Sequence, residues 1–280
     1  MLIFNTFFDT LLNGNGGLYA FMFDLVHILY MVISGLVSAA ILYLMHKHLK
    51  TEDKKTAGLK FFAIITVIIH YSSLWVDYLR DSTAEVEGPM LFPIHPCNVC
   101  MWLLVIVAFM KNKNSTVFRV ISEFLVLGGT VCGSIGIILN ANYDATPSLL
   151  DYDVLKGLLS HSTMLIGILY LLVGGFVKIR VKNVISVIAG LLIFFVDGLV
   201  INTLYAICGT EPCNSMYLLE APFPDIPWLI TPVMGIAGII VAFAITATYE
   251  QIALPKEERW YTLLKGKSSK AEKEESSSDK

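Results

Sequence analysis

Charged residues are scarce in this chain of 280 residues: Asp, Glu, Lys and Arg make up 15%, whereas hydrophobic residues make up 55%. A soluble domain typically carries about 25% charged residues, so the composition excludes an ordinary soluble domain. Nucleic-acid binding is excluded too, because the lysines lie in short loops and a tail and form no basic face interleaved with aromatic residues. The class that remains is an all-α polytopic membrane protein.

Several familiar sequence features are also missing. The N-terminus has no basic n-region, and Asp9 and Asp24 precede the first apolar stretch, so we expect an uncleaved anchor rather than a signal peptide. No internal repeat of about 20–50 residues is apparent, which weakens the interpretation of the chain as an inverted-repeat transporter. The last apolar stretch contains no lysine, which disfavours a retinal protein. The histidines form no HxxxH or HExxH pair on one helix face, so the signal for a metal site is weak and no metal or cofactor is predicted. The residues that such a site could use are His27, His70, His95, His161 and Asp77.

Seven apolar stretches are long enough, or nearly so, to cross a hydrocarbon core that needs about 20 helical residues. They are 22–45, 58–79, 94–110, 117–140, 159–177, 184–207 and 226–248. Their short connections predict a single bundle of seven transmembrane helices. We therefore expect an outer amphipathic N-terminal segment at 1–21, a seven-helix transmembrane domain at 22–253 and a disordered, charged cytoplasmic tail at 254–280.

The basic residues predict an orientation. Of the 20 lysines and arginines, all except Arg80 and Lys156 fall on one side of these seven stretches. The positive-inside rule places that side in the cytoplasm, so the N-terminus is expected outside and the C-terminus inside. We accordingly expect a multi-pass protein of the cell membrane whose partners are membrane lipids.

Polar residues within the apolar stretches gather at one depth, in the predicted outer half of the bilayer. They include His70 and Asp77 in the second stretch, His95, Cys97 and Asn98 in the third, His161 in the fifth, and Asp197 and Asn202 in the sixth. The presence of any single one of these residues is adequately explained by a hydrogen bond that it forms between helices. The shared depth of the set favours an outward-facing polar pocket. Nearby, Cys208 and Cys213 lie in an outer loop, where the pair could form a disulfide.

The cluster Pro93-Ile94-His95-Pro96-Cys97-Asn98 stands at the predicted membrane boundary. Proline is favoured as the first residue of a helix, so we expect Pro96 to begin the third helix and His95 to occupy the cap position. Cys97 would then lie in the first turn, where free backbone N–H groups and the helix dipole favour the nucleophilic thiolate. Either His95 or His161 could act as the general base.

Two stretches of this sequence resemble a known family. Residues 93–98 resemble the LPLHLCN-type motif of the YwaF-like integral membrane family. The later pattern, Asn202, then Asn214-Ser215-Met216-Tyr217-Leu218, then Pro222 and Pro227-Trp228, resembles that family's N…NYMYL…P…PWPWY stretch. The resemblance covers roughly residues 20–250 and implies about seven spans. Eukaryotic relatives are held to be phospholipid acyltransferases that use a cysteine thioester, which implies Cys97 as the nucleophile with a histidine partner.

The leading hypothesis is a lipid acyltransferase or acyl hydrolase with Cys97 as nucleophile and His95 or His161 moving the proton. Its substrate would be a phospholipid or a lysophospholipid. Substrate-binding residues in this hypothesis are Asn98, Asn202, Asn214, Tyr217, Asp197, Asp77 and His70. The competing hypothesis is a non-enzymatic carrier of small solutes or a ligand sensor that uses the same polar cluster. A third possibility is a protein that anchors partners through its basic tail.

Overall fold

The computed structural model describes residues 2–13, 18–83, 91–208, 213–222, 226–228 and 230–262, and all regular elements in these ranges are helices. The all-α prediction is therefore confirmed. The long helices are α2 (Leu25–His48), α3 (Glu52–Arg80), α9 (Tyr152–Val173), α10 (Val184–Ile207) and α11 (Thr231–Ala253). The shorter ones are α1 (Leu2–Asn13), α5 (Pro96–Phe109), α6 (Thr116–Phe124), α7 (Thr130–Ile138) and α8 (Asn142–Ala145), with a π-helical turn, Leu125–Gly129, joining α6 to α7.

Six segments are helical, long and apolar enough to cross a membrane within the described ranges: Leu25–His48, Glu52–Arg80, Thr116–Ala145, Tyr152–Val173, Val181–Ile207 and Thr231–Ala253. The prediction of a seventh full span at 94–110 was wrong. Helix α5 has 14 residues, so it is about 21 Å long, whereas the hydrocarbon core is about 30 Å thick. The helix begins at Pro96, as the sequence predicts, and ends at Phe109.

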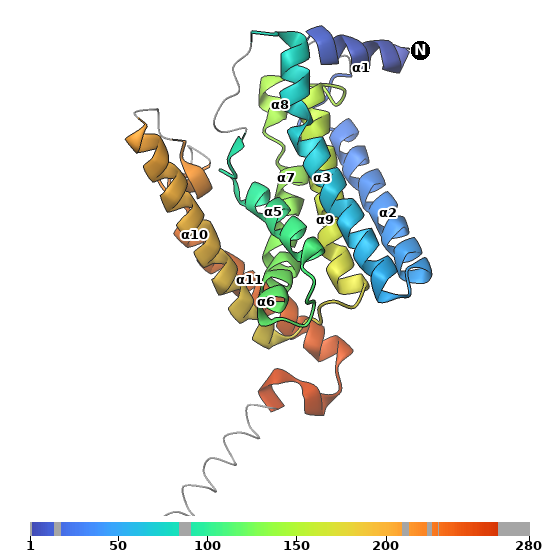
Figure 1. Ribbon diagram of the computed structural model, residues 1–280, viewed down its shortest axis with the longest axis vertical. Coiled ribbons are helices and arrows are strands. Elements are labelled where there is room, and N and C mark those ends of the chain that lie inside the picture. Colours follow the sequence, from blue (N-terminus) through green and yellow to red (C-terminus); the bar gives the residue numbers. More distant parts are fainter. Residues whose placement is uncertain are drawn as a thin grey trace, which may run out of the picture.

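Helices α3 and α9 form the centre of the bundle (Figure 1). Helix α2 packs on α9, α5 packs on α3, and α10 packs against α6 and α11 on the other side. The core between these helices is made of fully buried residues that include Leu59, Leu104, Leu125, Ile168 and Tyr170. Gly167 of α9 permits the close approach of α5, because a Cβ atom there would lie 2.8 Å from Leu104 Cδ2.

The outer surface of the bundle is apolar along most of its helices. Trp75, Ile207 and Ile252, for example, are 74%, 76% and 82% exposed. A continuous apolar surface of this extent is typical of a protein whose helices face lipid, and helices satisfy their own backbone hydrogen bonds there. The chain is thus a multi-pass membrane protein.

Charge is distributed unequally between the two ends of the bundle. Lys47, Lys50 and Lys54 are exposed around the connection between α2 and α3, at the lower end in Figure 1. At the other end, Arg80 and Lys156 both pair with Asp153, at 3.3 and 3.0 Å. The orientation with the N-terminus outside stays a prediction that rests on this asymmetry.

Helix α1 lies across the end of the bundle opposite those lysines (Figure 1). Arg80 holds it there, because its guanidinium donates hydrogen bonds to the carbonyl oxygens of Thr10 (3.0 Å) and Leu11 (3.1 Å) in the last turn of α1. These carbonyls have no partner within the helix itself. Helix α1 therefore covers residues 2–13 of the segment 1–21 that was predicted to be amphipathic, with Phe8 and Leu12 exposed.

The structure describes the chain after α11 as far as residue 262, which lies within the tail predicted to be disordered from residue 254. The buried carboxylate of Glu250 accepts hydrogen bonds from the backbone N–H groups of Val181 (2.7 Å) and Trp260 (2.8 Å). The ring of Trp260 also packs edge-on against Phe243, with the ring centroids 5.6 Å apart. These contacts fold the segment back onto α11. The rest of the predicted tail, 263–280, lies outside the described residues.

Candidate functional site

Helix α5 begins as the sequence predicts. His95 is the N-cap residue, in extended geometry (φ −110°, ψ 150°), and Pro96 is the first helical residue. The chain just before it is held by the loop after α10, since the carbonyl of Ile94 accepts hydrogen bonds from Met216 N–H (2.8 Å) and from the Ser215 hydroxyl (3.4 Å). The first turn of α5, which carries Cys97, therefore has a defined position.

A small cavity opens beside this turn, between α3, α5 and α9. It is lined by Thr66, His70, Cys97, Asn98, Met101, Ser160, His161 and Met164. Its volume of about 20 Å³ is enough for roughly one water molecule. The sequence placed Cys97 at the membrane boundary, but Thr66 and Met164 belong to the middle turns of α3 and α9. The cavity thus lies about halfway along the bundle, because α5 begins inside it.

His161 has a defined orientation in this cavity. Its Nδ1 atom lies 2.7 Å from the carbonyl oxygen of Gly157, one turn earlier in α9. A carbonyl oxygen can only accept, so Nδ1 carries a proton, and in the neutral imidazole Nε2 is the acceptor. The ring also packs on Gly136 of α7, where a Cβ atom would lie 2.2 Å from both Nε2 and Cδ2. The tautomer is the one that a general base requires.

The thiol of Cys97 lies in the same cavity and donates a hydrogen bond to the side-chain oxygen of Asn98, at 3.4 Å. The backbone N–H group of Asn98 donates to the carbonyl oxygen of His95, at 2.9 Å. Cys97 is partly buried, and desolvation by the surrounding protein atoms favours the neutral thiol over the thiolate. The sequence predicted a thiolate here; burial acts against that form, so a neighbouring base would have to remove the proton.

His95 occupies a different position from His161. Its ring stacks on Tyr217, with the centroids 5.5 Å apart and the planes inclined by 28°. Its Nδ1 atom is buried without a hydrogen-bond partner, and the residue is absent from the lining of the cavity. The sequence left His95 and His161 as equal candidates for the base; of these two, His161 is the one that lines the cavity with Cys97.

Two of the three asparagines predicted to bind substrate, Asn202 and Asn214, form hydrogen bonds with the backbone of the loop after α10. Asn202 accepts from Ser215 N–H (2.8 Å) and donates to its carbonyl (3.2 Å). Asn214 accepts from the N–H groups of Leu219 and Glu220. The loop needs such support, because its residues Asn214, Met216 and Tyr217 have positive φ angles of 46°, 56° and 51°. Left-handed geometry of this kind is unfavourable for most residues.

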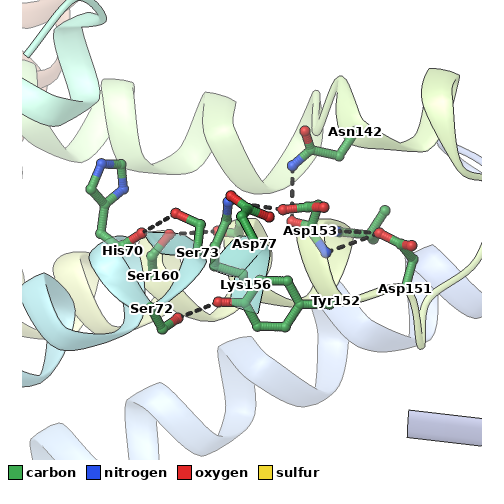
Figure 2. A network of polar contacts seen from close by, with 12 residues as sticks. His70, Ser72, Ser73, Asp77, Asn142, Asp151, Tyr152, Asp153, Lys156 and Ser160 are labelled. Atoms are coloured by element: carbon green, nitrogen blue, oxygen red, sulfur yellow. Dashed lines mark hydrogen bonds and ion pairs between the residues drawn. The ribbon is translucent and has the colours of Figure 1, made fainter. Parts of the chain in front are cut away.

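A network of polar side chains continues from the cavity along α3 and α9 (Figure 2). His70, which lines the cavity, is followed on α3 by Asp77, whose carboxylate lies 3.7 Å from the Arg80 guanidinium. From α9, Asp153 joins Arg80 and Lys156 in the same network. The carboxylate of Asp77, which the sequence predicted to bind substrate, therefore pairs with Arg80. Asp197 stands apart on α10, and its Oδ2 atom is buried without a hydrogen-bond partner.

Several residues around the cavity were missed from the sequence. The Gly157–His161 pair has i, i+4 spacing, which could have indicated the hydrogen bond that orients the imidazole. Gly136 could not have been found, because its contact with His161 joins two different helices. In the described part of the chain, no group of three or more His, Cys, Asp or Glu side chains is placed to hold a metal ion. Cys208 and Cys213 are free thiols.

Comparison with known proteins corrects the family. Residues 22–249 match the TMEM164 family. No curated protein matches the chain, and no solved structure does. The short motifs that resemble the YwaF-like family were misleading, because the family match runs from before α2 into α11 and so covers most of the chain. The chain belongs to the TMEM164 family, a eukaryotic family of transmembrane proteins that is loosely linked to lipid metabolism.

Proposed function

We propose that this protein is a membrane-embedded lipid acyltransferase or acyl hydrolase in which Cys97 is the nucleophile and His161 is the general base. One observation carries the proposal: the thiol and a histidine in the base-competent tautomer line one cavity inside the bundle. A nucleophile beside an oriented base is the arrangement that covalent acyl transfer needs. Membership in a family loosely linked to lipid metabolism agrees with it.

In the proposed first half-reaction, Nε2 of His161 takes the proton of the Cys97 thiol as sulfur attacks the ester carbonyl carbon of a phospholipid. The backbone N–H group of Cys97 in the first turn of α5 stabilises the resulting oxyanion, since the N–H groups of Asn98 and Val99 donate to the carbonyl of His95. Collapse of the tetrahedral intermediate breaks the ester C–O bond, and the departing lysolipid oxygen takes the proton back from His161. The acyl group is then held as a thioester on Cys97.

In the second half-reaction, the hydroxyl of a lysophospholipid, or water, gives its proton to His161 and attacks the thioester carbonyl. The C–S bond breaks, and the thiolate regains the proton from His161. The cavity must widen to admit an ester, since it has room for roughly one water. Met101 and Met164 line it, and their unbranched, flexible side chains can move aside at low cost.

The other polar residues have supporting roles in this proposal. Asn98 orients the Cys97 thiol, and His70 contributes a polar wall of the cavity. Asn202 and Asn214 hold the loop that carries Tyr217, which in turn packs on His95. The cell membrane stays the predicted location.

Trapping of the acyl-enzyme tests the proposal directly. Purified protein in liposomes is incubated with phospholipid that carries a labelled acyl chain, and is then denatured in acid. We expect label on the peptide that contains Cys97, and release of the label by neutral hydroxylamine, which cleaves thioesters. Label that is absent, or that resists hydroxylamine, contradicts the thioester mechanism.

Gly136→Ala is expected to reduce acyl turnover by roughly 10- to 100-fold, because the new methyl group displaces the ring of His161 from its hydrogen bond to Gly157. The matched control is Gly238→Ala in α11, where nothing lies within 4 Å of the new Cβ atom. Turnover of both variants is compared in liposomes, with thermal unfolding as a check on folding. Equal activity of the two variants would argue against His161 as the base.

A small-solute carrier or ligand sensor is the second candidate. It is favoured by Asp197, an ionisable residue within a spanning helix whose Oδ2 atom is buried without a hydrogen-bond partner. Solute flux or ligand-induced stabilisation that survives Cys97→Ala and is lost in Asp197→Asn would support this function over acyl transfer.

A further inference from the structure

Two apolar stripes lie on the exposed faces of α3 and α5, outside the cavity. Each stripe has three large side chains at helical spacing, and these are between 37% and 60% exposed: Phe61, Ile64 and Ile68 on α3, and Trp102, Ile106 and Phe109 on α5. The two helices pack against each other. Together the stripes form one continuous apolar surface.

Two contacts define how the stripes are aligned. At one end, Lys60 Nζ of α3 lies over the ring of Phe109, 5.0 Å from its centroid. At the other end, the rings of Tyr71 and Trp102 are 6.1 Å apart. The rise along α3 from residue 60 to residue 71 is about 16 Å, which is about half of a hydrocarbon core of about 30 Å. The surface therefore has the length of one leaflet.

Three lysines stand at the Phe109 end of this surface: Lys60, Lys111 and Lys113. None of them takes part in an ion pair within the described residues. Lys113 donates hydrogen bonds to the carbonyls of Val107 (2.5 Å) and Ala108 (3.0 Å), which end α5. Burial, together with the nearby charge of Lys60, lowers the pKa of Lys113 to about 8. Positive charge is thus concentrated here without a compensating acid.

We propose that this α3/α5 surface binds one anionic phospholipid, with an acyl chain along the two stripes and the phosphate at Lys60 and Lys111. A lipid is favoured over a soluble anion because the lysines continue directly from an apolar surface one leaflet long. An anionic headgroup is favoured over a zwitterionic one because the lysines have no acid beside them to receive a headgroup cation. The site is independent of the proposed reaction, since it lies on the exposed surface of α3 and α5 and outside the cavity that holds Cys97.

Native mass spectrometry of the purified full chain tests the site. Protein in detergent is mixed with phosphatidylglycerol or with phosphatidylcholine of the same acyl chains. We expect the fraction that retains one phosphatidylglycerol to be about tenfold larger than the fraction that retains one phosphatidylcholine. In Lys60→Gln/Lys111→Gln this preference should disappear. Lys113 is left unchanged because it caps α5.

Lys47→Gln/Lys50→Gln is the matched control, because it removes two exposed lysines at the same end of the bundle. It should keep the preference for phosphatidylglycerol, and Lys60→Arg/Lys111→Arg should restore it. Equal retention of the two lipids by the wild type overturns the proposal. So does an equal loss in both double variants, which would indicate a diffuse positive rim. Full displacement of the lipid by glycerol phosphate would also overturn it, since the site would then recognise the phosphate alone.

Discussion

Cys97→Ala is expected to abolish acyl turnover, with a loss on the order of 10³-fold or more. The substitution removes the only atom that can carry the acyl group in the proposed reaction. The first turn of α5 should survive it, because Pro96 and the hydrogen bonds at Ile94 position this turn without the thiol. Turnover is measured as the transfer of a labelled acyl chain from phospholipid to lysophospholipid, or to water, in liposomes.

Cys208→Ala is the control for this experiment. Cys208 is also a free cysteine, but it is exposed at the end of α10 and is absent from the cavity lining. Its replacement should leave turnover unchanged. Undiminished turnover in Cys97→Ala would rule out the thioester mechanism, whichever histidine acts as base. A loss in both variants would point to a general requirement for thiols and would also contradict the assignment.

His161→Gln is expected to lower kcat by roughly 10²- to 10⁴-fold, which is the usual effect of removing a general base. The glutamine side chain can still reach the carbonyl of Gly157 but offers no basic nitrogen to the thiol. Because the histidine acts on the proton and does not bind the lipid, KM should change little. The dependence of the residual activity on pH should also change, since the group that takes the proton has been removed.

His95→Gln separates the two histidines that the sequence left open. His95 stacks on Tyr217 and lies outside the cavity lining, so we expect its replacement to cost less than that of His161. A larger loss in His95→Gln than in His161→Gln would contradict our choice of base. It would instead indicate that the substrate approaches from the side of the loop after α10.

The sequence predicted those structural features that depend on residues adjacent in the chain. The long helices follow from apolar runs that must satisfy their own backbone in lipid. The start of α5 at Pro96 with His95 as its cap follows from the fixed φ angle of proline, and the structure has both. The uneven distribution of lysines could also be read directly, because it depends on composition and on the order of the helices.

Tertiary structure decided the features that depend on contacts between distant residues. Hydrophobicity alone could not indicate that α5 is too short to cross the membrane, since the irregular chain before it is stabilised by Ser215 and Met216 from a loop about 120 residues later. The same holds for Gly136, which seats the ring of His161 from another helix. The hydrogen bonds and packing of a side chain depend on the residues that surround it in space. The sequence could therefore identify Cys97 and His161 as candidates. Only the packing of α3, α5, α7 and α9 brings the two side chains into one cavity.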